Sequence, residues 1–142
     1  TESRFELAWV GACRIWLAPP QCFELATPVH SADPSLIEAS ALYVEPKPNR
    51  AQPSHPDFTA TQALGLTVAE TLRVPTRAGS RCPGMRFLLC TDGIDGPWSA
   101  LALHTTLRRE ELGAQECVDQ LLLTALEHGS RDNLSAILIR MR

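Results

Sequence analysis

The arrangement of apolar and polar residues near the N-terminus predicts two β-strands. Residues 5–10 (FELAWV) alternate large apolar side chains with smaller or polar ones, as a half-buried strand does. Residues 14–17 (RIWL) form a second short candidate strand. Because only three residues separate the two segments and Gly11 suits a tight turn, the pattern predicts an antiparallel hairpin that reverses near Gly11.

Apolar spacing in the second half predicts a strand, a helix and a final strand. Residues 86–90 (RFLLC) have the short apolar run of a buried strand, and 134–139 (LSAILI) form the closing strand. Residues 114–128 carry apolar side chains at helical spacing, and Gly129 terminates this helix. The apolar stripe consists of Val118, Leu121, Leu122, Ala125 and Leu126. This order of elements predicts an α+β fold with a mostly antiparallel sheet.

Prolines interrupt the middle of the chain. Eight of the eleven prolines fall between residues 19 and 56, where each fixes φ and removes a backbone donor. One short helix is predicted inside this stretch, at residues 35–42, with Asp33 as its cap and Pro34 at its first position. We interpret residues 19–56 as a proline-rich flap or insertion within one domain that spans residues 1–142.

Composition limits the classes of protein to consider. With 142 residues, 44% hydrophobic and 20% charged, the chain is long enough for one globular domain. A net charge of -3 without a basic patch argues against nucleic acid as a partner. No apolar run reaches the roughly 18–20 residues that span a membrane. Five cysteines without a C-x-x-C pair favour reduced thiols and a cytoplasmic protein, with Cys90 and Cys117 as core residues.

Two aspartates are placed where a metal could bind. Asp92 follows the apolar strand 86–90 and precedes Gly93, which permits a tight turn, while Asp132 precedes the last strand. In an antiparallel pair, the end of one strand and the start of the other share an edge of the sheet. Two carboxylates at one edge suit Mg²⁺ or Mn²⁺. On spacing alone, the simpler interpretation is that each aspartate makes a local turn with its own backbone.

The sequence lacks the motifs of several other hydrolases. None of the five cysteines has an arginine six positions later, as a cysteine-based phosphatase requires. There is no G-x-S-x-G turn, H-E-x-x-H helix or Walker loop. The four histidines are widely separated, without ligand spacing.

Four segments resemble the type 2C (PPM) family of metal-dependent serine/threonine protein phosphatases. FLLCTDGI at 87–94 resembles the family segment LLCSDGL, and GSRDNLSAILIR at 129–140 resembles GGxDNxTxxxv. FELAWVGACRIWL at 5–17 is similar to the hairpin VaHVGDSRaYL, and HPDFTATQALG at 55–65 to the stretch that carries LTRALG. The four blocks occur in family order and span nearly the whole chain. The chain therefore resembles the C-terminal half of this phosphatase domain.

The resemblance implies a sandwich of antiparallel β-sheets flanked by helices, with the N-terminal half of the domain absent from this chain. It implies a centre of two Mn²⁺ or Mg²⁺ ions that activates water to hydrolyse phosphoserine or phosphothreonine on a phosphorylated protein. By position, Asp92 and Asp132 become metal ligands, Gly93 supports the turn, and Asn133 orients Asp132. No catalytic residue is assigned.

The chain also departs from the family pattern. Ala12 replaces the aspartate of GDSR, and Gly96 stands where a further aspartate is expected four residues past Asp92. Asp95 lies one residue early and is an uncertain substitute, and Arg14, from the hairpin, is an uncertain site residue. Nothing resembles the early acidic ligands or the phosphate-contacting arginine of the N-terminal half. These differences suggest that an accessory third metal site is lost or remodelled.

Two functions remain open at this point. In the first, the chain is part of an active signalling phosphatase whose N-terminal half lies on the same polypeptide or on a partner chain. In the second, it is a degenerate module that binds a phosphoprotein or regulatory partner without catalysis. The loss at Ala12 and Gly96 favours the second function, and the retention of Asp92 and Asp132 favours the first.

Overall fold

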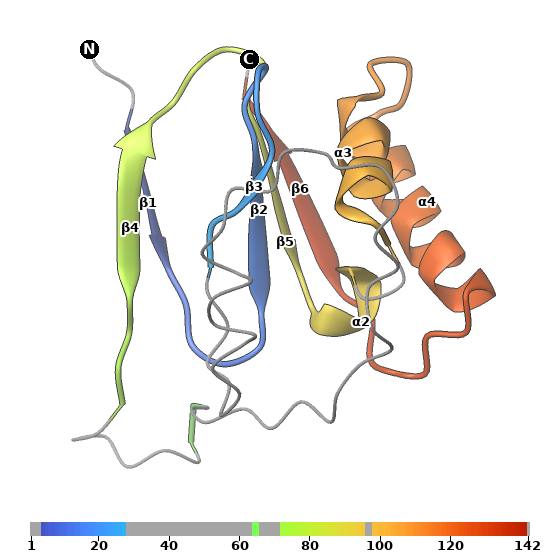
Figure 1. Ribbon diagram of the computed structural model, residues 1–142, viewed down its shortest axis with the longest axis horizontal. Helices are drawn as coiled ribbons and strands as arrows, with labels where there is room; N and C mark the ends of the chain where they lie inside the picture. The colour runs from blue at the N-terminus through green and yellow to red at the C-terminus, as the bar shows by residue number, and fades with distance from the viewer. Residues whose placement is uncertain (1–3, 28–63, 66–71, 96–97, 142) are drawn as a thin grey trace.

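The fold consists of two antiparallel β-sheets and a layer of helices (Figure 1). The protein's structure, a computed structural model, describes residues 4–27, 64–65, 72–95 and 98–141. The strands in this part are β1 (Arg4–Ala8), β2 (Arg14–Ala18), β3 (Glu24–Leu25), β4 (Thr76–Ser80), β5 (Arg86–Cys90) and β6 (Ala136–Arg140). The helices are α2 (Asp92–Asp95), α3 (Ala100–Arg108) and α4 (Ala114–Glu127). The predicted α+β class with antiparallel sheets is confirmed.

The larger sheet has the strand order β3-β2-β5-β6, and all neighbouring strands are antiparallel. β5 lies inside this sheet and has the bounds that the sequence predicts. The helices cover one face of the sheet and the two-stranded sheet covers part of the other (Figure 1). Because both faces of β5 are covered, residues 87–90 form a continuous apolar run rather than an alternation.

β1 and β2 do not form the predicted hairpin, and that prediction is wrong. β1 pairs with β4 in a separate two-stranded sheet. Residues 9–13 therefore carry the chain from one sheet to the other, and Gly11 adopts a φ of 84° within this link. A short link fits a crossover between facing sheets as well as a hairpin. The alternation of apolar residues in β1 also fits either arrangement, because one side of the strand is buried in both; here Phe5 and Leu7 face the layer between the sheets.

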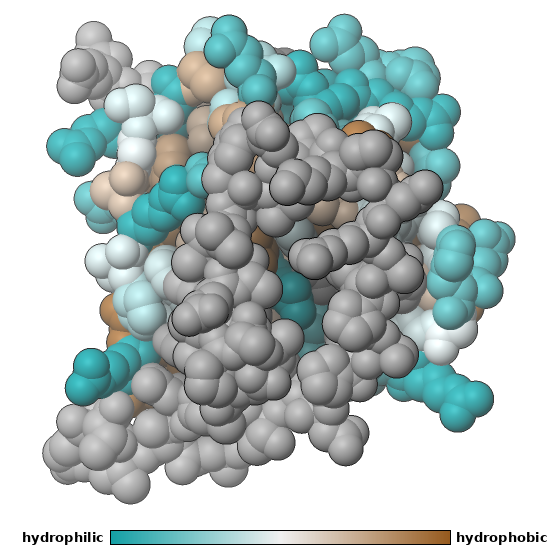
Figure 2. Space-filling view, in the orientation of Figure 1, coloured by the Kyte–Doolittle hydropathy of each residue, from teal (hydrophilic) through white to brown (hydrophobic). Residues whose placement is uncertain are grey.

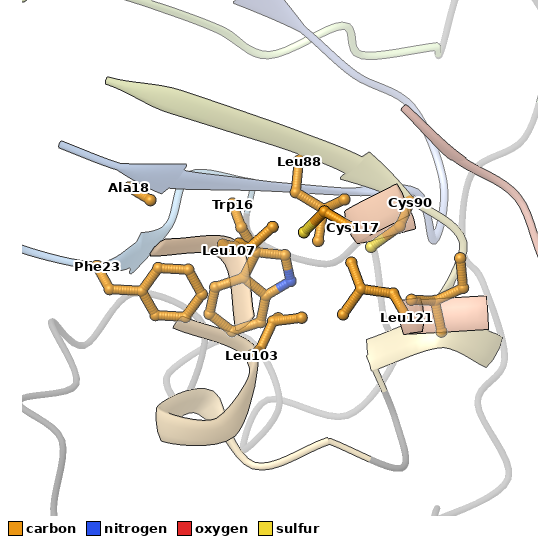
Figure 3. Close-up of a cluster of buried hydrophobic side chains, with 10 residues drawn as sticks. Trp16, Ala18, Phe23, Leu88, Cys90, Leu103, Leu107, Cys117 and Leu121 are labelled. Carbon is orange, nitrogen blue, oxygen red and sulfur yellow. The ribbon is translucent and has the colours of Figure 1, made fainter. Parts of the chain in front are cut away.

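A buried apolar cluster joins the helices to the larger sheet (Figure 3). Its members are Trp16, Ala18, Phe23, Leu88, Cys90, Ile94, Leu103, Leu107, Cys117 and Leu121. The rings of Trp16 and Phe23 stack with their centroids 4.8 Å apart. Cys90 and Cys117 are buried free thiols, which confirms their assignment to the core.

A second cluster fills the space between the two sheets. It consists of Ile15, Leu17, Ala26, Met85 and Phe87. Phe5 reaches it from β1, with its ring edge-on to Phe87 at a centroid distance of 5.1 Å. The Phe5 ring also covers Gly79 of β4, where a Cβ would lie 2.6 Å from the ring. Residues 76–80 (TRAGS) lack apolar alternation, so the sequence did not predict β4, which its pairing with β1 defines.

α4 confirms the predicted helix, ending one residue earlier than expected. Gly129 has a φ of 83°, and the N–H of Ser130 donates to the carbonyl of Ala125 at 3.0 Å, as in a glycine-terminated helix. Most of the predicted stripe faces the core, but Leu126 is 56% exposed, so that part of the prediction is wrong. It lies on the flank of the helix that turns away from the sheet.

α3 was not predicted from the sequence. Leu103 and Leu107, four residues apart, are its buried contacts. Ser99 caps its N-terminus by accepting the N–H of Ala102 at 3.1 Å. At the other end, buried Arg86 of β5 donates to the carbonyl of Leu107. Its apolar face is too short to stand out in the sequence, and contacts with the sheet define it.

The first residues of the proline-rich stretch include regular structure, whereas residues 28–56 lie outside the described part, so the flap stays a prediction. β3 pairs with β2, and the hydroxyl of buried Thr27 accepts the N–H of Ile15 at 2.9 Å. The predicted helix at 35–42 lies outside the described residues. At the C-terminus, β6 begins at Ala136, two residues later than predicted.

The outer strand of the larger sheet exposes apolar side chains. Ile137 and Ile139 of β6 are 62% and 44% exposed, and they lie opposite Leu89 and Phe87 of β5. Cross-strand partners share a face of the sheet, so both isoleucines point to the sandwich side. The flank occupied by the two-stranded sheet also shows apolar atoms among polar ones (Figure 2). No helix in the described part is long and apolar enough to cross a membrane.

Candidate metal centre

Thr91 connects the end of β5 to the segment that precedes β6. Its N–H donates to the carbonyl of Ser135 at 3.1 Å, and its hydroxyl donates to the carbonyl of Asn133 at 2.8 Å. The same hydroxyl accepts the N–H of Ser135 at 3.2 Å. These bonds extend the β5–β6 ladder by one residue, so the turn at Asp92 and the segment at Asp132 leave the sheet at the same edge.

Gly93 brings the two segments into direct contact. A Cβ at this position would lie 3.0 Å from the Cβ of Asp132, 3.0 Å from Cδ2 of Leu134 and 3.1 Å from the carbonyl oxygen of Asn133. Only a residue without a side chain fits this distance without displacement. The hydroxyl of Ser130 adds a bond to the carbonyl of Gly93 at 2.9 Å. Asp92 and Asp132 are therefore held on adjoining loops at one edge of the sheet.

Each carboxylate uses its Oδ1 atom in a local hydrogen bond. Oδ1 of Asp92 accepts the N–H of Gly93 at 3.0 Å, and Oδ1 of Asp132 accepts the N–H of Asn133 at 2.7 Å. Both bonds reach the next residue and not the second residue on, so they are local without forming the turn that the simpler interpretation expected. They do not conflict with metal binding, because a carboxylate has a second oxygen and further lone pairs. Asp92 is half-buried and Asp132 is exposed, so water and ions can reach the edge.

The other candidates from the sequence lie near the same edge. Arg14 begins β2 and is the cross-strand partner of Cys90, the last residue of β5. Asn133 contributes through its main chain, by its N–H to Asp132 and its carbonyl to Thr91. Asp95 is the last residue of α2, and its side chain lies outside what the structure describes.

The described residues supply only part of a metal site. They contain no group of three or more His, Cys, Asp or Glu side chains that could hold an ion. Two aspartate carboxylates are hard oxygen donors suited to Mg²⁺ or Mn²⁺, which need six ligands. The two carboxylates are therefore the right type of ligand for a divalent cation, but the described residues supply too few ligands to complete its coordination.

Sequence reasoning did not identify the residues that hold this edge together. Thr91 and Ser130 make the side-chain bonds that connect the two loops, and Leu134 packs on Gly93. A threonine directly after a buried strand and a serine after a helix terminator are common surface residues. Their partners lie about forty residues away, so only the paired strands could disclose their role.

Comparison with known proteins gives a consistent result at the level of fold. No protein-family model and no curated protein matches the chain. Solved structures do match it. PppA, a key regulatory component of the T6SS in Pseudomonas aeruginosa, is 24% identical with a TM-score of 0.73, over 97% of this chain and 52% of its own.

Two solved phosphatase structures match the chain to a similar extent. Stp1 from Staphylococcus aureus is 21% identical with a TM-score of 0.76, over 100% of this chain and 53% of its own. The catalytic domain of the serine/threonine phosphatase PstP, solved with two manganese ions, is 20% identical with a TM-score of 0.72, over 97% of this chain and 54% of its own. The chain has the fold of one half of a type 2C (PPM) phosphatase domain.

The type 2C fold accounts for the layers described above. The chain spans about half the length of the solved phosphatases that it matches. The order of its motifs corresponds to the C-terminal half. In the described part of the chain, β6 ends the larger sheet and exposes Ile137 and Ile139.

Proposed function

We propose that this chain belongs to a metal-dependent protein serine/threonine phosphatase and supplies Asp92 and Asp132 as metal ligands. The close approach of Gly93 to Asp132 is the observation that carries the proposal, because it holds the two carboxylate-bearing loops together at one edge. The β5–β6 register brings the two loops to this edge, and the absence of a side chain at Gly93 lets them approach. The substrate class is phosphoserine or phosphothreonine on a phosphorylated protein.

The residues of this chain prepare the edge for cations. Thr91 and Ser130 fix the two loops to each other, and the local N–H bonds to each Oδ1 orient both carboxylates. When bound, two Mn²⁺ or Mg²⁺ ions supply an activated water and neutralise charge on the phosphoryl oxygens. The main chain of Asn133 keeps Asp132 in position, which extends the supporting role expected for this residue.

The remaining ligands and a cationic phosphate-binding group come from the N-terminal half of the domain, on the same polypeptide or on a partner chain. Among the described residues no further strand pairs with β6 beyond β5, and Ile137 and Ile139 are exposed, which supports this proposal. Five free cysteines support a reducing, cytoplasmic location. A role in signalling rests on the proposed phosphatase activity alone.

A second candidate is a phosphatase-like module that binds a phosphoprotein or a regulatory partner without hydrolysis. Ala12 stands at the position where the family has a hairpin aspartate, and the described residues hold no cluster of three potential ligands. Both observations suit a chain that keeps the fold and has lost part of its chemistry. Retention of two aspartates on loops in contact favours the enzyme.

The decisive experiment joins this chain to the N-terminal half and measures release of phosphate from phosphoserine and phosphothreonine peptides. We expect hydrolysis that requires Mn²⁺ or Mg²⁺ and stops with a chelator. Asp92→Asn and Asp132→Asn should each lower the rate at least about 100-fold, the upper end of what loss of an outer-shell partner costs. Asp119→Asn, an exposed aspartate of α4, is the matched control and should leave the rate unchanged.

Phosphate release that survives both the chelator and Asp92→Asn contradicts the two-metal mechanism. Tight binding of the phosphopeptide without any release, under all metal conditions, supports the module without catalysis.

A further inference from the structure

Two half-buried cysteines lie far from the candidate metal centre, at the opposite end of the sandwich. The cross-strand row Arg14–Cys90–Ala136 marks the end of the sheet near Asp92, and the row Ala18–Arg86–Arg140 marks the other end. Cys22 comes four residues after Ala18, and Cys82 comes four residues before Arg86. The turns that carry the two thiols therefore extend from neighbouring strands at the same end.

These two turns lie beside each other. The N–H of Cys22 donates to the carbonyl of Pro19 at 3.4 Å, and the N–H of Met85 donates to the carbonyl of Cys82 at 3.1 Å. A Cβ added to Gly84 would lie 3.7 Å from Cγ of Pro20, so little more than the space of one methyl group separates the two turns there. Each thiol thus belongs to a compact turn that lies next to the other turn.

Strand alternation also directs both thiols to the layer between the sheets. Phe23 belongs to the buried cluster between the helices and the larger sheet, whereas Glu24 forms an ion pair with Arg77 of β4 at 2.7 Å. Glu24 and the residues two positions away from it therefore face the two-stranded sheet. Cys22 is two residues before Glu24 and shares its side. Cys82 packs against the cluster between the sheets.

We propose that Cys22 and Cys82 are a redox pair that forms a disulfide between the two turns when the protein meets a disulfide oxidant such as oxidised glutathione. One thiolate attacks the oxidant, which gives a mixed disulfide and releases one glutathione thiolate. The second thiolate then attacks the protein sulfur and displaces the second glutathione. Two electrons pass to the oxidant, which ends as two reduced glutathiones, and the two cysteines lose their protons.

The surroundings of Cys22 determine how fast this exchange proceeds. Burial raises the pKa of the Cys22 thiol, Glu24 and the thiol of Cys82 raise it further, and Arg77 opposes them. At neutral pH, Cys22 is therefore mostly protonated and exchanges slowly, and the rate rises as the pH increases. The pair responds to sustained oxidation or alkaline pH rather than to brief exposure.

The bond would tie the turn after β2 to the link between β4 and β5. The ring contact of Phe5 with Phe87 and the ion pair of Glu24 with Arg77 connect the two sheets in the folded chain. A disulfide would add a covalent connection and close a loop that includes all of residues 28–63. We expect it to stabilise the sandwich without changing metal binding, so the inference does not depend on the proposed function.

The test treats the folded chain with oxidised glutathione at pH 8 and counts thiols before and after. We expect exposed Cys13 to take up one glutathione and Cys22 and Cys82 to lose their thiols to each other, so that three of the five thiols disappear. Peptide mapping by mass spectrometry should find Cys22 joined to Cys82, and the midpoint of thermal unfolding should rise on the order of 10 °C. Dithiothreitol should reverse all these changes. Cys22→Ser and Cys82→Ser should each abolish the cross-link and the rise of the midpoint, whereas Cys13→Ser, which removes an exposed thiol, should keep both.

Three results would overturn the inference. The first is a map in which Cys22 and Cys82 carry only glutathione. The second is pairing of either residue with Cys13. The third is a Cys22–Cys82 bond that forms in urea but not in the folded chain, because it would show that the native turns keep the thiols apart.

Discussion

Gly93 packs against Asp132 so closely that a Cβ on the glycine would lie 3.0 Å from the Cβ of the aspartate. The contact joins the turn after β5 to the loop before β6. It places Asp92, the neighbour of Gly93, beside Asp132 at one edge of the sheet. The separation of the two carboxylate-bearing loops is therefore set by the absence of a side chain at residue 93.

Gly93→Ala should separate these loops. The added methyl group meets Asp132, Leu134 and the carbonyl of Asn133 within 3.1 Å, so the free energy of unfolding should fall by about 1–3 kcal/mol. Affinity for Mn²⁺ in the complete domain should fall as well, because the carboxylates move apart. Denaturant titration and calorimetric Mn²⁺ titration measure the two effects.

Gly129→Ala provides the matched control for Gly93→Ala. Gly129 has a φ of 83° and open space around it, so alanine there costs about 1–2 kcal/mol through backbone strain alone. Equal losses of Mn²⁺ affinity in the two variants would show that the Gly93 contact has no specific part in metal binding.

Ser130→Ala should loosen the edge without adding bulk. The substitution removes the hydroxyl that donates to the carbonyl of Gly93 at 2.9 Å, and it should lower stability by about 1 kcal/mol. We expect weaker Mn²⁺ binding and faster amide exchange at residues 93–95, measured by hydrogen–deuterium exchange. Ser130→Thr, which keeps the hydroxyl, should restore both. Unchanged exchange in Ser130→Ala would contradict a supporting role for this residue.

His104 should make the fold sensitive to mild acid. Its ring lies on Phe23 at a centroid distance of 5.0 Å, and burial, with a smaller effect of Arg108, lowers the pKa of His104. The native state then binds fewer protons than the unfolded state, in which the pKa is near 6.5. Stability should therefore be complete above about pH 6.5 and should decline as the pH falls below it.

Chemical denaturation of the wild type and of His104→Phe between pH 7.5 and pH 5 tests this prediction. Phenylalanine keeps the stacked ring and cannot take up a proton, so the variant should lose less stability in acid. Parallel pH curves for the two proteins would show that another group causes the dependence.

The isolated chain should associate through the exposed apolar face of β6. Ile137 and Ile139 point to the sandwich side and are exposed there, and exposed apolar side chains favour association. Replacing both with Thr should shift the chain toward the monomer in sedimentation velocity. Leu123→Thr, at an equally exposed position on α4, is the control and should have little effect. A wild-type chain that stays monomeric at high concentration would contradict this prediction.

The sequence alone determined the elements with strong local signals. The apolar run at 87–90 predicted β5, because a strand that is buried on both faces has consecutive apolar residues. The apolar spacing that ends at Gly129 predicted α4, because a helix that is buried on one side has apolar residues every three or four positions. The motifs around Asp92 and Asp132 indicated both the type 2C fold and the two carboxylates. Their ligand role stays a prediction.

Tertiary structure decided what local patterns cannot encode. β4 pairs with β1 in a register that puts Gly79 opposite Phe5, and the short link at Gly11 carries the chain between the two sheets instead of closing a hairpin. The same alternation of apolar residues would serve either pairing. The contact of Gly93 with Asp132 depends likewise on the β5–β6 register, which brings residues remote in sequence to one edge. Such contacts arise from packing between segments, so no single stretch of the chain specifies them.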